Sequence, residues 1–286
     1  MTSELVHALL EQLQDNNADT QQDAAIQLVE LGGVAVDAVI HALGTSPHAQ
    51  VRTLCAWALG EIGDARAVVP LLHALYDVEP RVQDWVTKAL GELGDLRAVD
   101  PLIQALGARS PNVRRHAAAA LGWLGDTRAV SALITALDDK SPDVRASAAE
   151  GLGKLKDPQA VKPLIALSRD GDDWVRVRVA YALYELKHPS ALQTFLRLIS
   201  DRHEWVRTHA ANALGDLAAP ACFAPLRDHL RADPSPNVRR ACAISLGKLG
   251  GDAAVEVLVS ALADTEDIVL EAVDQALQQL GYSIDT

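Results

Sequence analysis

The sequence predicts an all-α solenoid of nine helix pairs, and three observations support this prediction. The 286-residue chain repeats itself about every 31 residues, a period typical of stacked helical units. Each repeat holds two apolar patterns with the period of an α-helix. The 49% of apolar residues are mostly Ala, Leu and Val, with only two Phe and one Met, which suits closely packed helices better than a thick globular core.

The second helix of each repeat, helix B, has the clearer pattern, VRxxAAxALGxL. At 100° per residue, positions 1, 5, 8, 9 and 12 share one arc and predict the core. Positions 3, 4, 7 and 11 lie on the other side and predict a surface for solvent or a partner. Gly at position 10 predicts a close approach of neighbouring helices. The valines at position 1 are Val51, Val82, Val113, Val144, Val175, Val206, Val238 and Val269.

The first helix, helix A, follows the pattern RAVxPLIxAL, and turn signals separate it from helix B. Pro70 and Pro101 predict the first turn of helix A or a kink there. Gly125 ends one helix B, and Asp126 offers an N-terminal cap to the next helix A. Helices 3–14 and 269–280 complete the array, so residues 1–286 are predicted to form a single domain without a linker. The predicted repeats are approximately 3–33, 34–64, 65–95, 96–126, 127–157, 158–188, 189–219, 220–251 and 252–282.

Composition narrows the function classes. The net charge of −12 and pI near 5.1 argue against nucleic acids and anionic membranes as partners. Three cysteines without a CxxC spacing favour a reducing compartment. The opening stretch MTSELVHALLEQLQD lacks the basic region of a secretory signal, and no apolar run reaches about 18 residues. We therefore expect a soluble, cytoplasmic protein.

The combined pattern, AVxPLIxAL followed by VRxxAAxALGxLGD, resembles the HEAT repeat, specifically the phycobilisome-lyase-type HEAT-like repeat family. The resemblance covers essentially the whole chain. It implies a right-handed superhelix, an α-solenoid whose B helices line the concave face. The same repeats occur in bilin lyase subunits, regulatory scaffolds and adaptors, so the resemblance indicates the fold more specifically than the function.

Recurring charges have a structural interpretation under this resemblance. In the HEAT family, an Arg at helix-B position 2 bridges to an Asp of the adjacent layer, five residues before the valine. The predicted ladder residues are Arg52, Arg114, Arg145, Arg176, Arg207 and Arg239 with Asp77, Asp139, Asp170, Asp201, Asp233 and Asp264. Small or apolar residues at core positions are predicted to fill the core, namely Cys55, Cys222, Cys242, Phe195 and Phe223.

No motif for catalysis appears. The pair His203-Glu204 resembles one half of the iron-binding His-Glu pairs of deoxyhypusine hydroxylase, another protein built of HEAT-like repeats. One pair supplies too few ligands, so we predict no metal site. The chain has no HExxH, GxSxG or P-loop sequence, and its ALGELGD glycines end and pack helices rather than hold phosphate.

Aromatic residues in the surface arc of helix B are the main functional signal. The fold does not require an exposed indole at these positions. Rigid rings among Arg, His and Asn are typical of recognition surfaces. The predicted partner-binding residues are Trp57, Trp85, Arg115, His116, Trp123, Glu150, Arg178, Tyr181, His209 and Asn212. Trp174 and Trp205 directly precede helix-B valines, and the sequence leaves open whether they bind a partner or pack locally.

The sequence therefore predicts a non-enzymatic scaffold or adaptor that binds a protein on its concave face, without a cofactor. The alternative is a bilin lyase-like or chromophore-handling protein acting on phycobiliproteins, with bilin as its ligand and Arg115 and Arg178 meeting the propionates. DNA binding, as in HEAT-like alkylpurine glycosylases, is disfavoured because acidic residues alternate with the basic ones. The partner's identity and the oligomeric state stay open.

Overall fold

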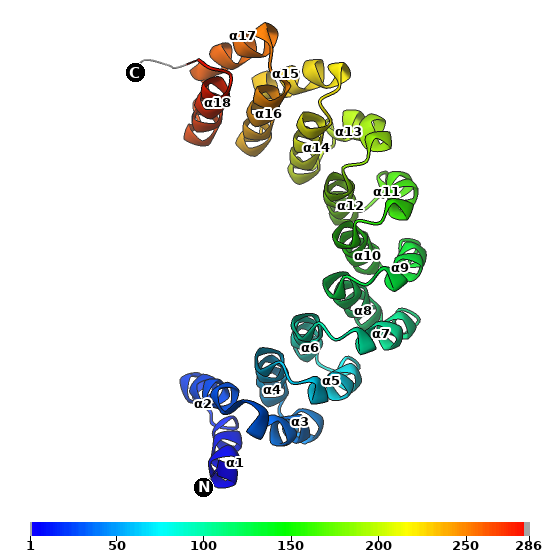
Figure 1. The fold of residues 1–286 in the computed structure, drawn as a ribbon, viewed down its shortest axis with the longest axis vertical. Coiled ribbons are helices and arrows are strands. Elements are labelled where there is room, and N and C mark those ends of the chain that lie inside the picture. Colours follow the sequence, from blue (N-terminus) through cyan, green and yellow to red (C-terminus); the bar gives the residue numbers. More distant parts are fainter. Residues whose placement is uncertain (1, 283–286) are drawn as a thin grey trace. The chain divides into compact units, whose positions relative to one another are not determined.

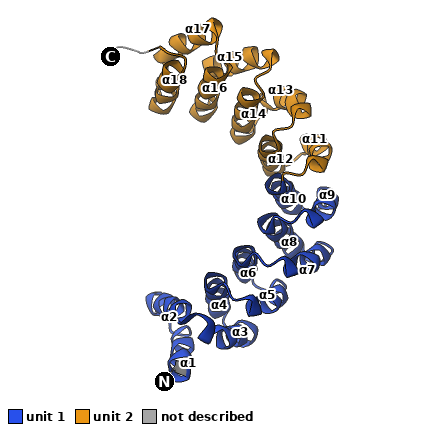
Figure 2. Cartoon of the chain, in the orientation of Figure 1, with its two compact units in different colours: residues 1–155 blue, residues 156–286 orange. Residues whose placement is uncertain are grey.

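The structure is a computed structural model that describes residues 2–282. These residues form eighteen α-helices and no β-strand, which pair into nine layers as predicted (Figure 1). The chain divides into two compact units, unit 1 (residues 1–155) and unit 2 (residues 156–286), shown in Figure 2. Whether residues 1–286 behave as a single domain stays a prediction.

Unit 1 holds five layers. Its A helices are α1 (Thr2–Gln12), α3 (Val36–Thr45), α5 (Val68–Ala74), α7 (Val99–Ala105) and α9 (Val130–Ala136). Its B helices are α2 (Ala18–Leu31), α4 (Ala49–Ile62), α6 (Pro80–Leu93), α8 (Pro111–Leu124) and α10 (Pro142–Leu155). Successive B helices pack side by side on the inner side of the unit, and the A helices cover the outer side (Figure 1).

Unit 2 repeats this arrangement in four layers. Its A helices are α11 (Val161–Leu167), α13 (Leu192–Leu198), α15 (Phe223–Ala232) and α17 (Asp252–Ser260). Its B helices are α12 (Asp173–Leu186), α14 (Glu204–Leu217), α16 (Pro236–Leu249) and α18 (Asp267–Gln279). As in unit 1, the B helices form the inner layer (Figure 1).

The turn signals act as predicted. Helix α8 ends at Gly125, whose φ of 71° is in the left-handed region that glycine adopts without strain. The Asp126 carboxylate then accepts a hydrogen bond of 2.9 Å from the backbone N–H of Arg128 and starts a short 3₁₀ turn before α9. Pro70 lies in the first turn of α5, where its missing N–H costs no helical hydrogen bond.

The predicted core positions of helix B are buried, with one exception. In α8, Val113, Ala117, Ala120 and Leu121 are at most 2% exposed. The position-12 leucine, Leu124, is half-buried because it occupies the last turn of the helix. Cys55, Cys222, Cys242 and Phe195 are buried as predicted, whereas Phe223 is only partly so. Burial raises the pKa of the Cys55 thiol to about 12.

Glycine at position 10 lets adjacent B helices approach closely. A Cβ on Gly122 would lie 2.6 Å from the Cα of Gly151, and one on Gly215 would lie 2.8 Å from the Cα of Ser245. Since no side chain fits at these distances, the prediction for this position is confirmed. Helix α12 departs from it, because Tyr184 occupies position 10 there.

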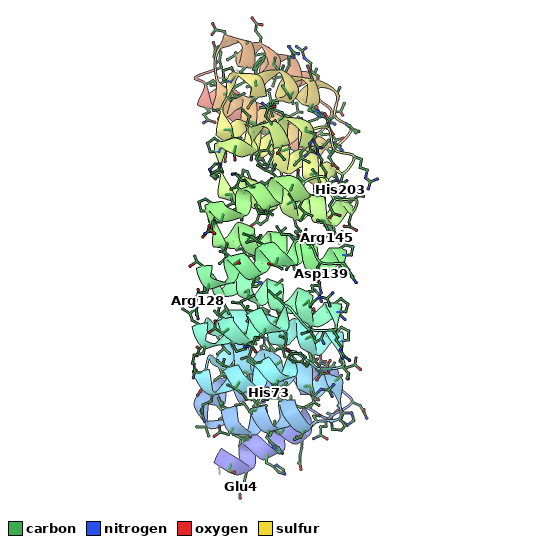
Figure 3. All side chains as sticks on the ribbon, turned by 90° about the vertical axis from the view of Figure 1, so that its right-hand side faces the viewer. Glu4, His73, Arg128, Asp139, Arg145 and His203 are labelled. Atoms are coloured by element: carbon green, nitrogen blue, oxygen red, sulfur yellow. The ribbon has the colours of Figure 1, made fainter. Side chains whose placement is uncertain are left out.

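An ion-pair ladder joins adjacent layers within each unit, as the resemblance implied. Each rung places an Arg side chain of one layer on the Asp of the next, with Nε–Oδ2 distances of 2.7–2.8 Å, while its Nη1 binds loop carbonyls of its own layer. The rungs are Arg52–Asp77, Arg114–Asp139, Arg176–Asp201, Arg207–Asp233 and Arg239–Asp264. In unit 1, Asp139 and Arg145 lie on one edge of the stack and Arg128 on the other (Figure 3).

Candidate binding surfaces on the B helices

Trp123 is the most prominent candidate residue. It lies at position 11 of α8, and its indole is 60% exposed on the B-helix surface of unit 1. Its Cβ packs on Gly91 of α6, and the Lys154 ammonium of α10 lies 3.9 Å from the ring centroid. Glu150 binds that same ammonium at 3.1 Å. Contacts from the two neighbouring B helices, α6 and α10, therefore hold the indole while most of it stays exposed.

Trp57 and Trp85 lie on the same surface but are half-buried. The Trp57 indole N–H donates to Glu61 at 3.1 Å within α4, and the Lys88 ammonium lies 4.7 Å from the Trp85 ring centroid within α6. Among the described residues, no ring contact joins Trp57, Trp85 or Trp123 to another aromatic ring. The three rings are therefore separate from one another and do not form a mutually packed aromatic stripe.

His116 is buried, so the surface position that the helical arc predicted for it is wrong. It is 2% exposed, and Arg115 covers it, with 2.7 Å between Arg115 Nη2 and His116 Nε2. Asp84 of α6 lies 3.0 Å from Arg115 and 3.3 Å from His116. The helical arc of α8 alone could not show this, because it does not predict that the Arg115 side chain lies over the ring and meets Asp84 of α6. Burial and the Arg115 charge lower the pKa of His116 to about 4, so the ring is neutral near pH 7.

In unit 2, the predicted residues on α12 and α14 form a smaller cluster, and all of them are half-buried. Tyr181 contacts His209 edge to face at a centroid distance of 5.7 Å. The Arg178 guanidinium lies 5.5 Å from the Trp174 ring centroid. Burial and the charge of Arg178 hold the pKa of His209 below its ordinary value, although Glu185 opposes this shift. Asn212 lies one turn beyond the Tyr181–His209 contact.

Trp174 and Trp205 are more exposed than a packing role requires. Their side chains are 55% and 46% exposed at the starts of α12 and α14. The His203 ring lies 5.9 Å from the Trp174 ring, and its Nδ1 accepts a hydrogen bond from the backbone of Trp205. Both indoles therefore extend the surface of the unit 2 cluster.

The His203-Glu204 pair is used structurally. His203 caps α14, and the Glu204 carboxylate accepts a hydrogen bond from Ser235 of the next layer. Within residues 2–282, no group of three or more His, Cys, Asp or Glu side chains is arranged to hold a metal ion. In the same residues, no helix is both long and apolar enough to cross a membrane.

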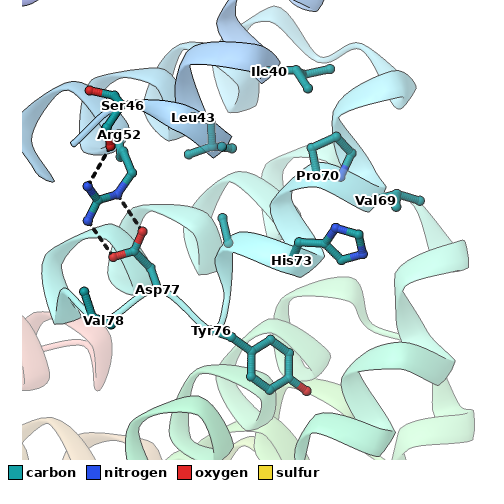
Figure 4. A pocket seen from close by; sticks show the side chains of 12 residues that line it. Ile40, Leu43, Ser46, Arg52, Val69, Pro70, His73, Tyr76, Asp77 and Val78 are labelled. Atoms are coloured by element: carbon teal, nitrogen blue, oxygen red, sulfur yellow. Dashed lines mark hydrogen bonds and ion pairs between the residues drawn. The ribbon is translucent and has the colours of Figure 1, made fainter. Parts of the chain in front are cut away.

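A hollow of about 700 Å³ on the A-helix side of unit 1 was missed by sequence reasoning (Figure 4). It lies between α3 and α5, and the Arg52–Asp77 rung forms one wall. Val69, Tyr76 and Val78 border it and are largely exposed. The repeat carries a signal for it, because the next layer has Asp100, Gly107 and Arg109 at the positions of Val69, Tyr76 and Val78.

Comparison with known proteins agrees with this architecture. The HEAT-repeat family matches residues 6–91, 69–142, 130–208 and 195–278. Escherichia coli YibA has a TM-score of 0.68 at 22% identity, with 94% of this chain and 99% of that chain covered. A Kap121p mutant has a TM-score of 0.74 at 15% identity, with 96% of this chain and 37% of that chain covered.

The complex of CpcE and CpcF of phycocyanin lyase from Nostoc sp. PCC7120 has a TM-score of 0.50 at 22% identity, with 86% of this chain and 94% of that chain covered. At these identities the likenesses show the fold alone. No curated protein sequence matches the chain. Because the family match covers nearly all of the described residues, this chain belongs to the family of HEAT-repeat proteins.

Proposed function

We propose that this HEAT-repeat chain is a non-enzymatic scaffold that binds a protein partner on the surface of its B helices, with Trp123 as the central contact of unit 1. The exposed, positioned indole of Trp123 is the observation that supports the proposal. At this position the neighbouring layers carry the charged residues Glu92 and Lys154. An indole held by Gly91 and Lys154 loses little conformational entropy on binding, so its burial contributes directly to affinity.

The surroundings of Trp123 also suit a protein interface. The B helices α6, α8 and α10 hold both signs of charge, in the pairs Arg115–Asp84 and Lys154–Glu150, as in the polar rim of a typical interface. In unit 2, Arg178, Tyr181, His209 and Asn212, together with Trp174 and Trp205, form a second proposed set of contacts with the same composition.

A triple substitution tests the unit 1 surface. The variant Trp57→Ala, Trp85→Ala, Trp123→Ala should keep its helical circular dichroism, because all three rings lie outside the core. Proteins captured by the wild-type chain from a lysate of the source cells, identified by mass spectrometry, should be lost. Trp123→Ala alone should weaken binding of the purified partner by about 30-fold or more, the size expected for a central indole.

The matched control is Tyr76→Ala, which removes an aromatic ring that is 58% exposed on the A-helix side. It should leave capture unchanged. Replacing Trp123 by a photoreactive benzoylphenylalanine should crosslink the same partner. Capture that survives the triple substitution, or that is lost with Tyr76→Ala alone, would place the binding surface elsewhere.

Bilin handling, the alternative suggested by the sequence, stays a prediction, since the likeness to the phycocyanin lyase complex is a likeness of fold. Mixing the purified chain with phycocyanobilin and recording the visible spectrum tests it. An unshifted spectrum at micromolar protein would contradict this alternative.

A further inference from the structure

Tyr184 changes how two layers of unit 2 pack. In unit 2, Gly215 and Gly247 at position 10 bring their helices so close that even a Cβ would clash with the next B helix. Helix α12 carries the phenol of Tyr184 at this position, so α12 and α14 cannot approach in the same way. The A helix beneath differs too, because Phe195 of α13 occupies the position of Leu164 and Leu226 in the adjacent layers.

A pocket of about 390 Å³ lies beside this substitution, and residues in or at the ends of α12, α13 and α14 line it together with Lys248 of α16. Leu183, Phe195 and Ala213 are buried and form its apolar part, and Tyr184 stands at its side. The phenylalanine therefore fills only part of the space that the tyrosine opens. At this size the pocket is at the small end of ligand sites and fits a molecule of one or two rings.

The polar part of the pocket carries an excess of positive charge. The Asp216 carboxylate lies 2.6 Å from the Lys248 ammonium and 3.3 Å from the Lys187 ammonium. Two cations thus share one carboxylate. A second acidic group, Glu185 of α12, is engaged by Lys156 at 2.9 Å. Burial of Asp216 opposes its ionisation, but the hydrogen bond from Lys248 and the two charges outweigh this and hold its pKa below the ordinary value.

We propose that this pocket is a binding site for a small aromatic carboxylate. The ring occupies the apolar part between Tyr184 and Phe195, and the carboxylate meets Lys187 and Lys248 at the open end. Lys187 is well placed for this, because its ammonium also lies 5.9 Å from the Tyr184 ring and is largely exposed. A cation that is only half neutralised by Asp216 favours an anion over a neutral or cationic ligand of the same shape.

The probe for this site is 2-naphthoate, measured by isothermal titration calorimetry with the full chain at low ionic strength. We expect saturable binding with one site. The neutral analogue 2-naphthalenemethanol should bind at least about tenfold more weakly, and 2-naphthylmethylamine should not bind measurably. No binding of 2-naphthoate at millimolar concentration, or equal binding of the neutral analogue, would overturn the proposal.

Two variants locate the site. Lys187→Gly removes one ammonium and places glycine at a left-handed backbone position (φ 49°), so the fold should be at least as stable while 2-naphthoate binding falls about tenfold. Tyr184→Gly combined with Phe195→Leu restores the residues of the neighbouring layers. It should close the pocket and abolish binding without lowering the melting temperature. Binding that is unchanged in both variants would show that the probe binds elsewhere.

This inference does not depend on the proposed scaffold function. Trp123→Ala should leave 2-naphthoate binding unchanged, since Trp123 belongs to unit 1, and Lys187→Gly should leave capture by the unit 1 surface unchanged. Loss of 2-naphthoate binding in Trp123→Ala would contradict the assignment to the unit 2 pocket.

Discussion

Single non-glycine residues with left-handed backbone angles lower the stability of the folded chain. Ala218 ends α14 with φ of 47°, where Gly63, Gly94 and Gly125 end the B helices of other layers. A non-glycine residue in this conformation costs about 1–2 kcal/mol, whereas glycine adopts it freely. Part of any gain from glycine is offset by the greater entropy of the unfolded chain.

Ala218→Gly should therefore stabilise the chain by about 0.5–1 kcal/mol. Chemical denaturation followed by circular dichroism measures this change. The reciprocal control is Gly125→Ala, which should destabilise by a similar amount. A lower stability of Ala218→Gly would contradict the backbone argument.

Buried His116 makes stability depend on pH. Burial, chiefly, and the Arg115 charge lower its pKa from 6.5 to about 4 in the folded chain. Between these values the unfolded state binds more protons than the folded state, so the stabilisation present above pH 6.5 is lost progressively as the pH falls towards 4. From pH 7.5 to pH 5, this residue should cost about 2 kcal/mol of stability.

Comparing the wild type with His116→Gln isolates this effect from the titration of carboxylates. The difference in unfolding free energy between the two proteins should change by about 2 kcal/mol over that range, in favour of the variant at low pH. A difference that is constant with pH would show that His116 is not buried as described.

At the scale of elements, the ladder is incomplete in unit 1. Gln83 of α6 takes the place of the ladder Arg, and Ala108 takes the place of its Asp. The Gln83 amide donates to the backbone carbonyl of Asp77 at 2.6 Å. Its Oε1, however, is a buried oxygen without a hydrogen-bond partner in the described part of the chain, although the residue is only 5% exposed. Such an oxygen costs about 1–3 kcal/mol.

The double substitution Gln83→Arg, Ala108→Asp should restore the missing rung between α6 and α8. Each single substitution should destabilise, because it leaves one charge without a partner in a partly buried place. The double variant should recover at least the wild-type stability, which gives a favourable coupling energy of about 2 kcal/mol in a double-mutant cycle. Additive effects would mean that the two side chains do not meet.

The repeat made the elements predictable, and the limits of the prediction lie in contacts between elements. Position 1 valines, position 10 glycines and the Arg–Asp rungs follow from comparing layers, because each layer repeats the same local packing. His116 was misplaced because the arc of one helix contains no information about Arg115 and Asp84 covering the ring. The Tyr184 pocket depends on the separation between α12 and α14, and the pattern of one helix does not give that separation.

At the scale of the whole molecule, charge limits the partners. The net charge of −12 gives the chain no general attraction for a polyanion. In fluorescence anisotropy with a labelled DNA duplex at about 50 mM salt, we expect no binding at micromolar protein. Salt-sensitive binding in this assay would contradict the proposal that the partner is a protein and would favour a nucleic acid.

The distribution of rungs has a mechanical consequence. In unit 2 the steps α12–α14, α14–α16 and α16–α18 each carry an Arg–Asp bridge, whereas in unit 1 the step α6–α8 does not. A solenoid stretched from its ends behaves as springs in series, and its softest link lengthens first. Under tension on unit 1, the step between α6 and α8 should therefore lengthen before the bridged steps α4–α6 and α8–α10, because it lacks the Arg–Asp bridge that they carry.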